Sequence, residues 1–188
     1  MSQAGKDRDD YLDAVLIGGR EERVIEIVDY RPTWVDRFEA ERARIEAALG
    51  PLARRVEHIG STAVPGLAAK PIVDIMVTVG DPDDEQLYGP ELERVGYVIR
   101  VREAGHRMFR TPERDVHVHI WAAGGEDERR HLVFRDWLRS NADDRAEYER
   151  TKRTLAGRHR DMNDYADAKR ELIEQLVERA GHEGARHS

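Results

Sequence analysis

The chain contains no cysteine among its 188 residues. This absence excludes disulfide bonds, thiolate metal ligands and a cysteine nucleophile, and it is compatible with the cytoplasmic location that we expect. No stretch approaches the roughly 18 consecutive apolar residues of a membrane-spanning helix. The first ten residues, MSQAGKDRDD, also lack the apolar stretch of a signal peptide, so we expect neither secretion nor a membrane partner.

Aromatic side chains are scarce, at 6% of the chain, whereas charged ones reach 37%. The apolar residues nevertheless recur in periodic segments, which argues against a disordered chain. An excess of positive charge is also missing: the formal net charge is −7, so the overall field repels polyanions. Long nucleic acid is therefore a poor candidate partner. No feature of the sequence indicates an oligomeric state.

The length of the chain predicts one domain with a helical extension. We expect an N-terminal arm over residues 1–22, an α/β core over 23–125, a helical segment packed on that core over 126–182, and a tail over 183–188. The expected class is α+β, with a mixed β-sheet flanked by helices rather than a doubly wound sheet.

Short β-branched runs predict strands, and apolar residues at helical spacing predict helices. Strands are expected at 24–28, 54–59, 72–79, from 96 onward, at 106–111 and at 115–121, the last two joined as a hairpin. Helices are expected at 83–95, 127–139, 142–157 and 161–180, and from an N-cap at Thr33 to Leu49 with Trp34, Phe38 and Ile45 on the same face.

The segment HIGSTAVPGLAAKPIVDIMV, residues 58–77, places one carboxylate inside an apolar strand. Because side chains alternate across a strand, Val73 and Ile75 lie on one face, and Asp74 and Met76 lie on the other. Burying an unpaired charge costs several kcal/mol. Asp74 is therefore expected either to face a cleft that holds cations or to be fixed by hydrogen bonds to the preceding loop.

The turn before this strand favours the first of these alternatives, in which Asp74 faces a cleft that holds cations. Gly60, Ser61 and Thr62 bring backbone N–H groups and two hydroxyls to one tight turn, and Lys70 adds a positive charge nearby. Such a turn is typical of a phosphate site. A phosphate next to the Asp74 carboxylate requires a cation between them, which is the chemistry of metal-assisted phosphoryl transfer.

A second candidate group lies in the strand DVHVHIW, residues 115–121. Alternation places His117 and His119 on one face, where they are either metal ligands or structural residues. His58 and His106 are further histidines that are candidates to converge on the same place.

The chain resembles the GrpB family over roughly residues 24–180, in the ordered segments YRPTWVDRFEAE, VEHIGSTAVPGLAAKPIVDIMVTV, VGYVIR, DVHVHIW, HLVFRDWLRSNADDRAEYERTKRTLA and YADAKRELIEQLVERA. That family is placed in the nucleotidyltransferase superfamily of the DNA polymerase β type. The resemblance implies a nucleotidyltransferase-like mixed sheet with flanking helices and a C-terminal helical segment. Membership in the family itself supplies no established reaction.

The superfamily signature is carried by Gly60 and Ser61 after a hydrophobic residue, then a spacer over residues 62–73, then Asp74. The sequence departs from it at Met76, where the superfamily has a second acid. A thioether is a poor ligand for Mg²⁺, and two-metal sites need several carboxylates. His117 or His119 is the candidate replacement ligand, which favours Mn²⁺ or Zn²⁺ over Mg²⁺.

The resemblance also selects residues of the C-terminal helices. In related folds this segment closes over the nucleotide, so Arg135, Lys152 and Lys169 are candidates to neutralise phosphates. Tyr165 is a candidate to stack on the base. Each of these residues has a plain structural alternative, either as a surface charge or as core packing.

Three functions stay open at this stage. The first is an enzyme that transfers a nucleotidyl or phosphoryl group to a small molecule, with Asp74 anchoring the metal and His117 or His119 completing its shell or acting as general base. The second is a non-catalytic nucleotide-binding or regulatory module. The third is a single-metal hydrolase built on the same three residues. Neither the nucleotide nor the acceptor can be read from the sequence.

Overall fold

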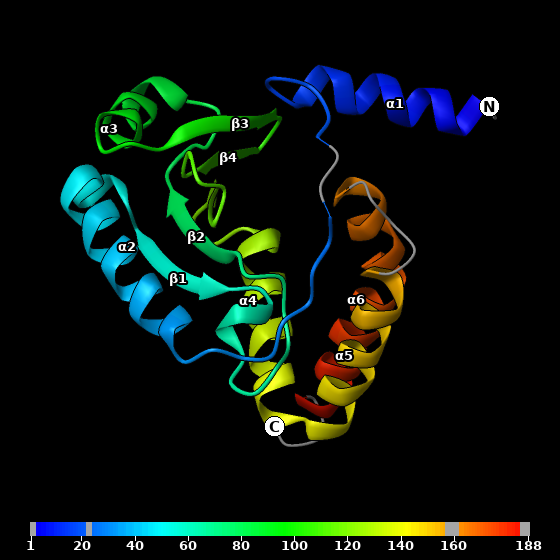
Figure 1. Cartoon of the computed structure of the whole chain (residues 1–188). Coiled ribbons are helices and arrows are strands. Elements are labelled where there is room, and N and C mark those ends of the chain that lie inside the picture. Colours follow the sequence, from blue (N-terminus) through cyan, green and yellow to red (C-terminus); the bar gives the residue numbers. More distant parts are fainter. Residues whose placement is uncertain (1–2, 22–23, 157–161, 185–188) are drawn as a thin grey trace.

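The structure is a computed structural model that describes residues 3–21, 24–156 and 162–184. Figure 1 shows a β-sheet at the centre, with helices on both of its faces and the C-terminal helices gathered at one side. Within the described part of the chain, no helix is both long and apolar enough to cross a membrane.

One mixed sheet of five strands forms the centre of the molecule. In spatial order its strands are β1 (Arg55–Ile59), β2 (Val73–Val79), β5 (Val116–Ala122), β4 (His106–Arg110) and β3 (Val98–Glu103). β2 and β5 are parallel, whereas every other neighbouring pair is antiparallel. A mixed sheet with helices on its faces confirms the α+β class predicted from the sequence.

One face of the sheet packs against α2 (Thr33–Leu49), as the alternation along the strands predicts. The core on this face contains Trp34, Phe38, Ile45 and Leu49 of the helix together with Val73, Ile75, Val77, Val79, Val116, Val118 and Ile120 of the strands. The helix begins at Thr33 itself, after Pro32, without a side-chain cap, so the predicted N-cap role of Thr33 is wrong. The helix ends at Leu49, as predicted, and Gly50 follows it with a φ of 52°.

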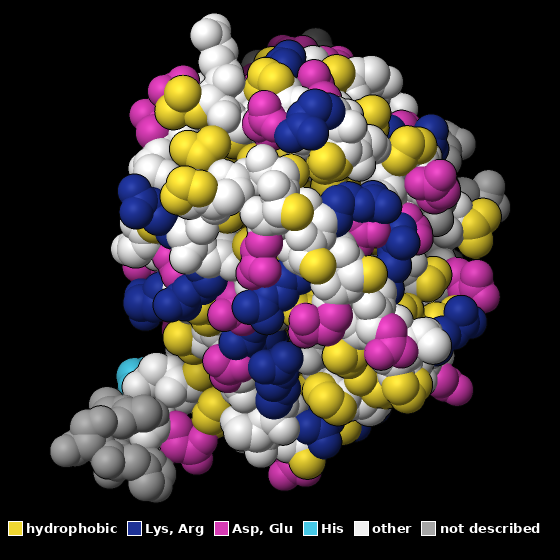
Figure 2. Space-filling view, turned by 90° about the vertical axis from the view of Figure 1, so that its left-hand side faces the viewer, with side chains coloured by type: hydrophobic (Ala, Val, Ile, Leu, Met, Phe, Trp, Pro, Cys, Tyr) yellow, Lys and Arg dark blue, Asp and Glu magenta, His cyan; other side chains and the backbone are white. Residues whose placement is uncertain are grey.

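The outer side of α2 and of α3 (Gly89–Arg94) carries charges of both signs, which Figure 2 shows interspersed with scattered apolar side chains. Arg42 pairs with Glu46 at 2.9 Å, within one helix turn. Exposed pairs of this kind contribute about 0–1 kcal/mol. This face is therefore a solvated surface and offers no single-sign patch to a polyanion.

The C-terminal part forms α4 (Glu126–Ser140), α5 (Ala142–Ala156) and α6 (Met162–Gly184), close to the three predicted helices. They share a second apolar cluster, in which Phe134, Leu138, Tyr148 and Leu176 are buried together with Val64 and Leu67 of the loop before β2. This loop therefore packs on the helices, while the strands on either side of it belong to the sheet.

Two predicted elements are wrong. Residues 24–28 do not form a strand: Val24 is exposed, and only Val28 makes a bridge, to Ala69 in the loop before β2. The predicted helix over 83–95 is divided into a short 3-10 turn, Glu85–Leu87, and α3. Pro90 lies in the first turn of α3, where a missing N–H is tolerated, and it cannot continue a helix from before.

The N-terminal region forms α1 (Gln3–Val15), which crosses above the gap between the sheet and the C-terminal helices in Figure 1. Leu16 bridges to Val101 of β3, and Arg8 pairs with Asp167 of α6 at 2.7 Å. The helix therefore contacts both the edge of the sheet and the helical segment.

Candidate functional site

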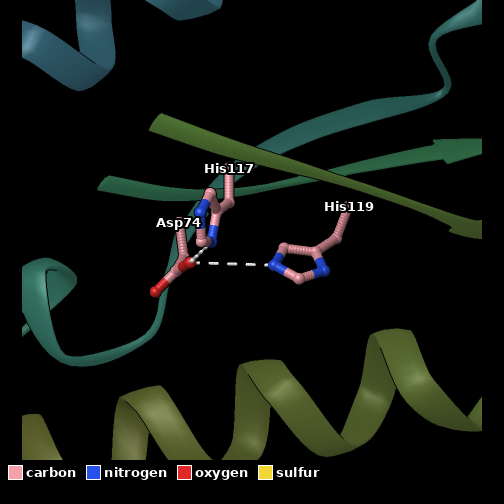
Figure 3. Close-up of side chains that lie close together, drawn as sticks. All are labelled: Asp74, His117 and His119. Atoms are coloured by element: carbon pink, nitrogen blue, oxygen red, sulfur yellow. Dashed lines mark ion pairs between the residues drawn. The ribbon is translucent and has the colours of Figure 1, made fainter. Parts of the chain in front are cut away.

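The centre of the site is a carboxylate and two imidazoles on the two parallel strands. Asp74 lies opposite His117 in the register, and His119 lies one step further along the same face. His117 Nδ1 is 3.5 Å and His119 Nε2 is 3.7 Å from Asp74 Oδ1. Figure 3 shows both rings converging on the carboxylate. One ligand atom from each residue lies within 4.8 Å of the other two, which is close enough for one metal ion to bind all three.

The chemistry of these three donors fits a single divalent cation. Imidazole nitrogens together with a carboxylate suit a first-row ion such as Mn²⁺ or Zn²⁺, whereas Mg²⁺ takes oxygen ligands. Burial raises the pKa of Asp74, but the adjacent imidazoles of His117 and His119 lower it by more, so the net direction is downward. The carboxylate is therefore ionised at neutral pH, as a metal ligand must be.

Met76, where the sequence departs from the expected superfamily signature, is fully buried. It packs with Ile59 and Trp121, and Leu132 of α4 covers this small cluster. An apolar environment of this kind is unsuited to a carboxylate or a second cation. Among the described residues, Asp74, His117 and His119 are the one group arranged to hold a metal.

The turn after β1 lies directly against the carboxylate. Gly60 has a φ of 69°, and a Cβ atom built on it would lie 2.7 Å from Asp74 Oδ2. Thr62 is buried, and its hydroxyl donates to Ile72 O at 3.2 Å and lies 3.0 Å from His58 Nε2. The Thr62 side chain therefore fixes the loop, while Ser61 is half-buried and is hydrogen-bonded to Tyr148.

The carboxylate and the turn line a cavity of about 390 Å³ between the sheet and the C-terminal helices. All predicted site residues except one are in its wall: Gly60, Ser61, Thr62, Lys70, Asp74, His117, His119, Lys152, Tyr165 and Lys169. A volume of this size is typical of small-molecule sites. A larger hollow of about 910 Å³ lies elsewhere, beside Arg54 and Trp137, and contains none of the three metal-binding candidates.

Three lysines cluster in the cavity and form a lysine wall: Lys152 of α5, Lys169 of α6 and Lys70 of the loop before β2. Lys169 Nζ and Lys70 Nζ lie 4.3 and 4.9 Å from the centre of the Tyr165 ring. Tyr165 is fully buried, so its ring supports these two ammonium groups, and the predicted base stacking has no open ring face. Lys152 is 2% exposed, donates to Ala68 O, and lies 4.8 Å from the centre of the Tyr148 ring.

Two of these lysines have lowered pKa values. Burial, assisted by the charge of Lys169, lowers the pKa of Lys152 to about 7. Burial also lowers the pKa of Lys169 to about 8, although the charge of Asp74 opposes this shift. A cavity that crowds positive charges in this way is electrostatically suited to an anion, which relieves their repulsion.

Arg135 is the exception among the predicted residues. Its guanidinium donates to Glu57 Oε2 at 2.7 Å and to His58 O at 3.1 Å, and so ties α4 to β1 outside the cavity. The expected phosphate contact is therefore not supported by its position. Phe134, the preceding residue, does face the cavity, and one step along a helix turns the next side chain away.

Sequence reasoning missed Arg130, His131 and Arg170, which also line the cavity. Arg130 stands four residues before Phe134, on the same helix face, and this spacing was the available signal.

Of the two further histidines that were candidates for the site, His58 does not reach it and His106 does. His58 lies on the other face of the sheet, stacked on Phe38 with ring centres 4.8 Å apart.

His106 does reach the site. Its Nε2 is 3.1 Å from His119 Nδ1, and burial lowers the pKa of His106 to about 3. The indole of Trp121 lies nearly parallel to both imidazole rings, with centre distances of 4.9 Å to His106 and 5.1 Å to His119. The two histidines therefore form a packed pair beneath one aromatic ring.

A mixed sheet with a glycine turn after its first strand and a cavity-lining carboxylate on its second defines an α+β protein with a candidate cation site between the sheet and the C-terminal helices. The chain belongs to the GrpB family, whose sequence model, described as GrpB protein, matches residues 24–179. The resemblance inferred from the sequence is thereby confirmed.

Known proteins resemble the chain over most of its length. A UPF0157 protein of Streptomyces coelicolor is 49% identical over 181 residues, covering 96% of this chain and 97% of that protein. The crystal structure of GrpB from Enterococcus faecalis matches with a TM-score of 0.73 and 37% identity, over 82% of this chain and 96% of the other. The Cid1 poly(U) polymerase is a distant neighbour, with a TM-score of 0.46 and 13% identity over 80% of this chain and 46% of that one.

Proposed function

We propose that this protein is a cytoplasmic metal-dependent transferase that uses a nucleoside triphosphate to modify a small molecule. One observation carries the proposal: the Asp74, His117 and His119 cluster and the lysine wall face the same 390 Å³ cavity. A metal-ligand set opposite several ammonium groups is the arrangement that a polyphosphate needs. Its partners are the nucleotide and a small acceptor.

The two predicted regions supply different parts of the site. The core, residues 23–125, supplies the ligands Asp74, His117 and His119, and the helical segment, 126–182, supplies Lys152 and Lys169. When bound, the cation neutralises phosphate charge as a Lewis acid. Backbone N–H groups of the turn at 60–62 bind phosphate oxygens, because a left-handed glycine followed by a tight turn makes an anion-binding concavity.

The side chains of the chain handle charge and protons in this proposal. Lys70, Lys152 and Lys169 neutralise the phosphates and orient the phosphoryl group for in-line attack. One of the two imidazoles would hold the cation, and the other would accept the proton of the attacking hydroxyl, since a neutral imidazole is basic near pH 7. The leaving group would be pyrophosphate in a nucleotidyl transfer, or the nucleoside diphosphate in a phosphoryl transfer.

A single-metal hydrolase is the second candidate. It is favoured by the fully buried Met76, which leaves one cation site where polymerase-type chemistry uses two. On this alternative the same three ligands hold the ion, and water replaces the acceptor hydroxyl.

Titration calorimetry with ATP, GTP and CTP, each with and without Mn²⁺, separates the candidates. Metal-dependent nucleotide binding that is lost in Asp74→Ala and weakened in Ser61→Ala supports the transferase. Tight Zn²⁺ binding without any nucleotide binding supports the hydrolase, and metal-independent binding without turnover supports a regulatory module. Lys169→Gln is expected to weaken nucleotide binding, and Arg129→Gln, which removes one exposed positive charge outside this cavity, is its control.

A further inference from the structure

His106 and His119 are joined through their ring edges. The two rings are nearly parallel, at 8°, with centres 5.3 Å apart, yet His106 Nε2 and His119 Nδ1 are only 3.1 Å apart. The nitrogens are much closer than the ring centres, so they point at one another, and the contact is a hydrogen bond rather than a face-to-face stack.

The other ends of the pair determine where the protons lie. His106 Nδ1 is 3.4 Å from Glu103 Oε2, and a carboxylate can only accept. For two neutral rings, His106 therefore carries its proton on Nδ1 and accepts at Nε2, which makes His119 Nδ1 the donor. His119 Nε2 is then left with its lone pair, on the side that faces Asp74.

Packing holds this arrangement in place. Trp121 covers both imidazoles, and His131 also packs against the indole, with ring centres 4.5 Å apart. Glu103 is fixed in turn by the hydroxyl of Tyr11, which donates to it from α1. A continuous series of contacts therefore links α1, through Glu103 and His106, to the candidate cation ligand His119.

We propose that Glu103 and His106 are positioning residues that hold His119 as the Nδ1–H tautomer, with its unprotonated Nε2 directed at the cation site. This inference rests on the proposed metal site. Partners of this kind orient a metal-binding imidazole and raise its basicity. The cation is accordingly a first-row divalent ion bound through His119 Nε2, and Mg²⁺ is a poor occupant.

The tautomer is measured directly by nitrogen-15 NMR of the metal-free, full-length protein. His119 is expected to show a protonated Nδ1 and an unprotonated Nε2 above pH 7. The substitution His106→Leu is expected to remove this preference. A wild-type His119 that is protonated at Nε2 overturns the inference, whatever the protein binds.

Affinity for the metal alone, Mn²⁺ or Zn²⁺, tests the consequence. His106→Leu is expected to weaken binding about 10- to 100-fold. His106→Gln is expected to restore most of it, because the amide oxygen accepts from His119 and the amide nitrogen donates to Glu103. Glu103→Ala breaks the far end of the contact without disturbing the apolar packing and is expected to weaken binding several-fold.

The outcomes distinguish this inference from the function on which it rests. If the wild-type protein binds neither ion, both fail. If it binds one of them and His106→Leu and Glu103→Ala bind it equally well, the positioning role alone fails. Equal losses in His106→Leu and His106→Gln also overturn it, because they indicate a packing role. Thermal melts of all variants establish that each compared protein is folded.

Discussion

Gly60 and Asp74 are packed so closely that a Cβ atom on the glycine would lie 2.7 Å from Asp74 Oδ2. The φ of 69° at Gly60 is a second reason for glycine at this place. The turn and the carboxylate are therefore one unit, and a change in the turn moves the candidate metal ligand.

Gly60→Ala is expected to weaken Mn²⁺ binding by at least tenfold, because the new methyl group displaces the carboxylate. Gly66→Ala is the matched control, since Gly66 also has a positive φ, 79°, but no atom lies within 4 Å of its added Cβ. Both variants are expected to lose about 1–2 kcal/mol of unfolding free energy from backbone strain. Calorimetry and urea denaturation measure the two effects, and equal metal affinity in both variants would contradict the first.

Asp74→Asn is expected to abolish metal binding while changing the free energy of unfolding by no more than about 1 kcal/mol. The carboxylate is 31% exposed at a cavity wall and is partnered by two histidines, so the isosteric amide leaves the packing intact. A thermal melt checks stability, and Asp115→Asn, outside the cavity, is the control. A loss of several kcal/mol would instead assign Asp74 a structural role.

The sequence could predict those parts of the site that depend on local periodicity, but not those that depend on how strands and helices pack together. Alternation along single strands correctly placed Asp74 opposite the core face of its strand, and His117 and His119 together on one face of theirs, because this periodicity is local. The contact between His106 and His119 depends on the register of β4 against β5, which no local pattern encodes. The outward turn of Arg135 likewise depends on how α4 lies on the sheet.

The error at residues 24–28 has the same origin. Their β-branched composition is suited to a strand, but strand formation needs a partner of matching length, and Val28 meets only the loop at Ala69. The hairpin before β5 was predictable, since its turn residues are adjacent in sequence. Arg114 adopts a positive φ of 63° there.

Met76→Asp is expected to destabilise the protein by several kcal/mol instead of creating a second cation site. The new carboxylate would be enclosed by Ile59, Trp121 and Leu132, with no cation partner in that cluster. Met76→Leu, which nearly conserves volume, is expected to cost less than about 1.5 kcal/mol. Urea denaturation measures both variants. A stable Met76→Asp protein with new Mg²⁺ dependence would show that the cluster opens into a polymerase-like site.

Stability is expected to rise with pH between about 7 and 10.5 through Lys152. Its pKa is lowered from 10.5 to about 7, so over this interval the unfolded chain binds a proton that the folded chain does not. The free energy of unfolding then increases by up to about 1.4 kcal/mol per pH unit from this group. Denaturation of the wild type and of Lys152→Met across this range gives the difference, and parallel curves would contradict the prediction.

Binding of inorganic triphosphate to the Mn²⁺-loaded protein is expected to take up protons at pH 8. At this pH Lys152, with a pKa of about 7, is mostly neutral, and Lys169, with a pKa of about 8, is half neutral. A polyanion beside them favours their charged forms and raises both pKa values, so protons are drawn from the buffer.

The measured enthalpy of binding must then differ between two buffers of unlike ionisation enthalpy. Near pH 6 both lysines are already charged, so wild type and Lys152→Gln are expected to show the same difference between the buffers. Lys152→Gln is expected to reduce the uptake at pH 8, whereas Arg129→Gln, on an exposed turn of α4, is expected to leave it unchanged. The same proton uptake in wild type and Lys152→Gln at pH 8 would mean that the phosphates bind away from Lys152.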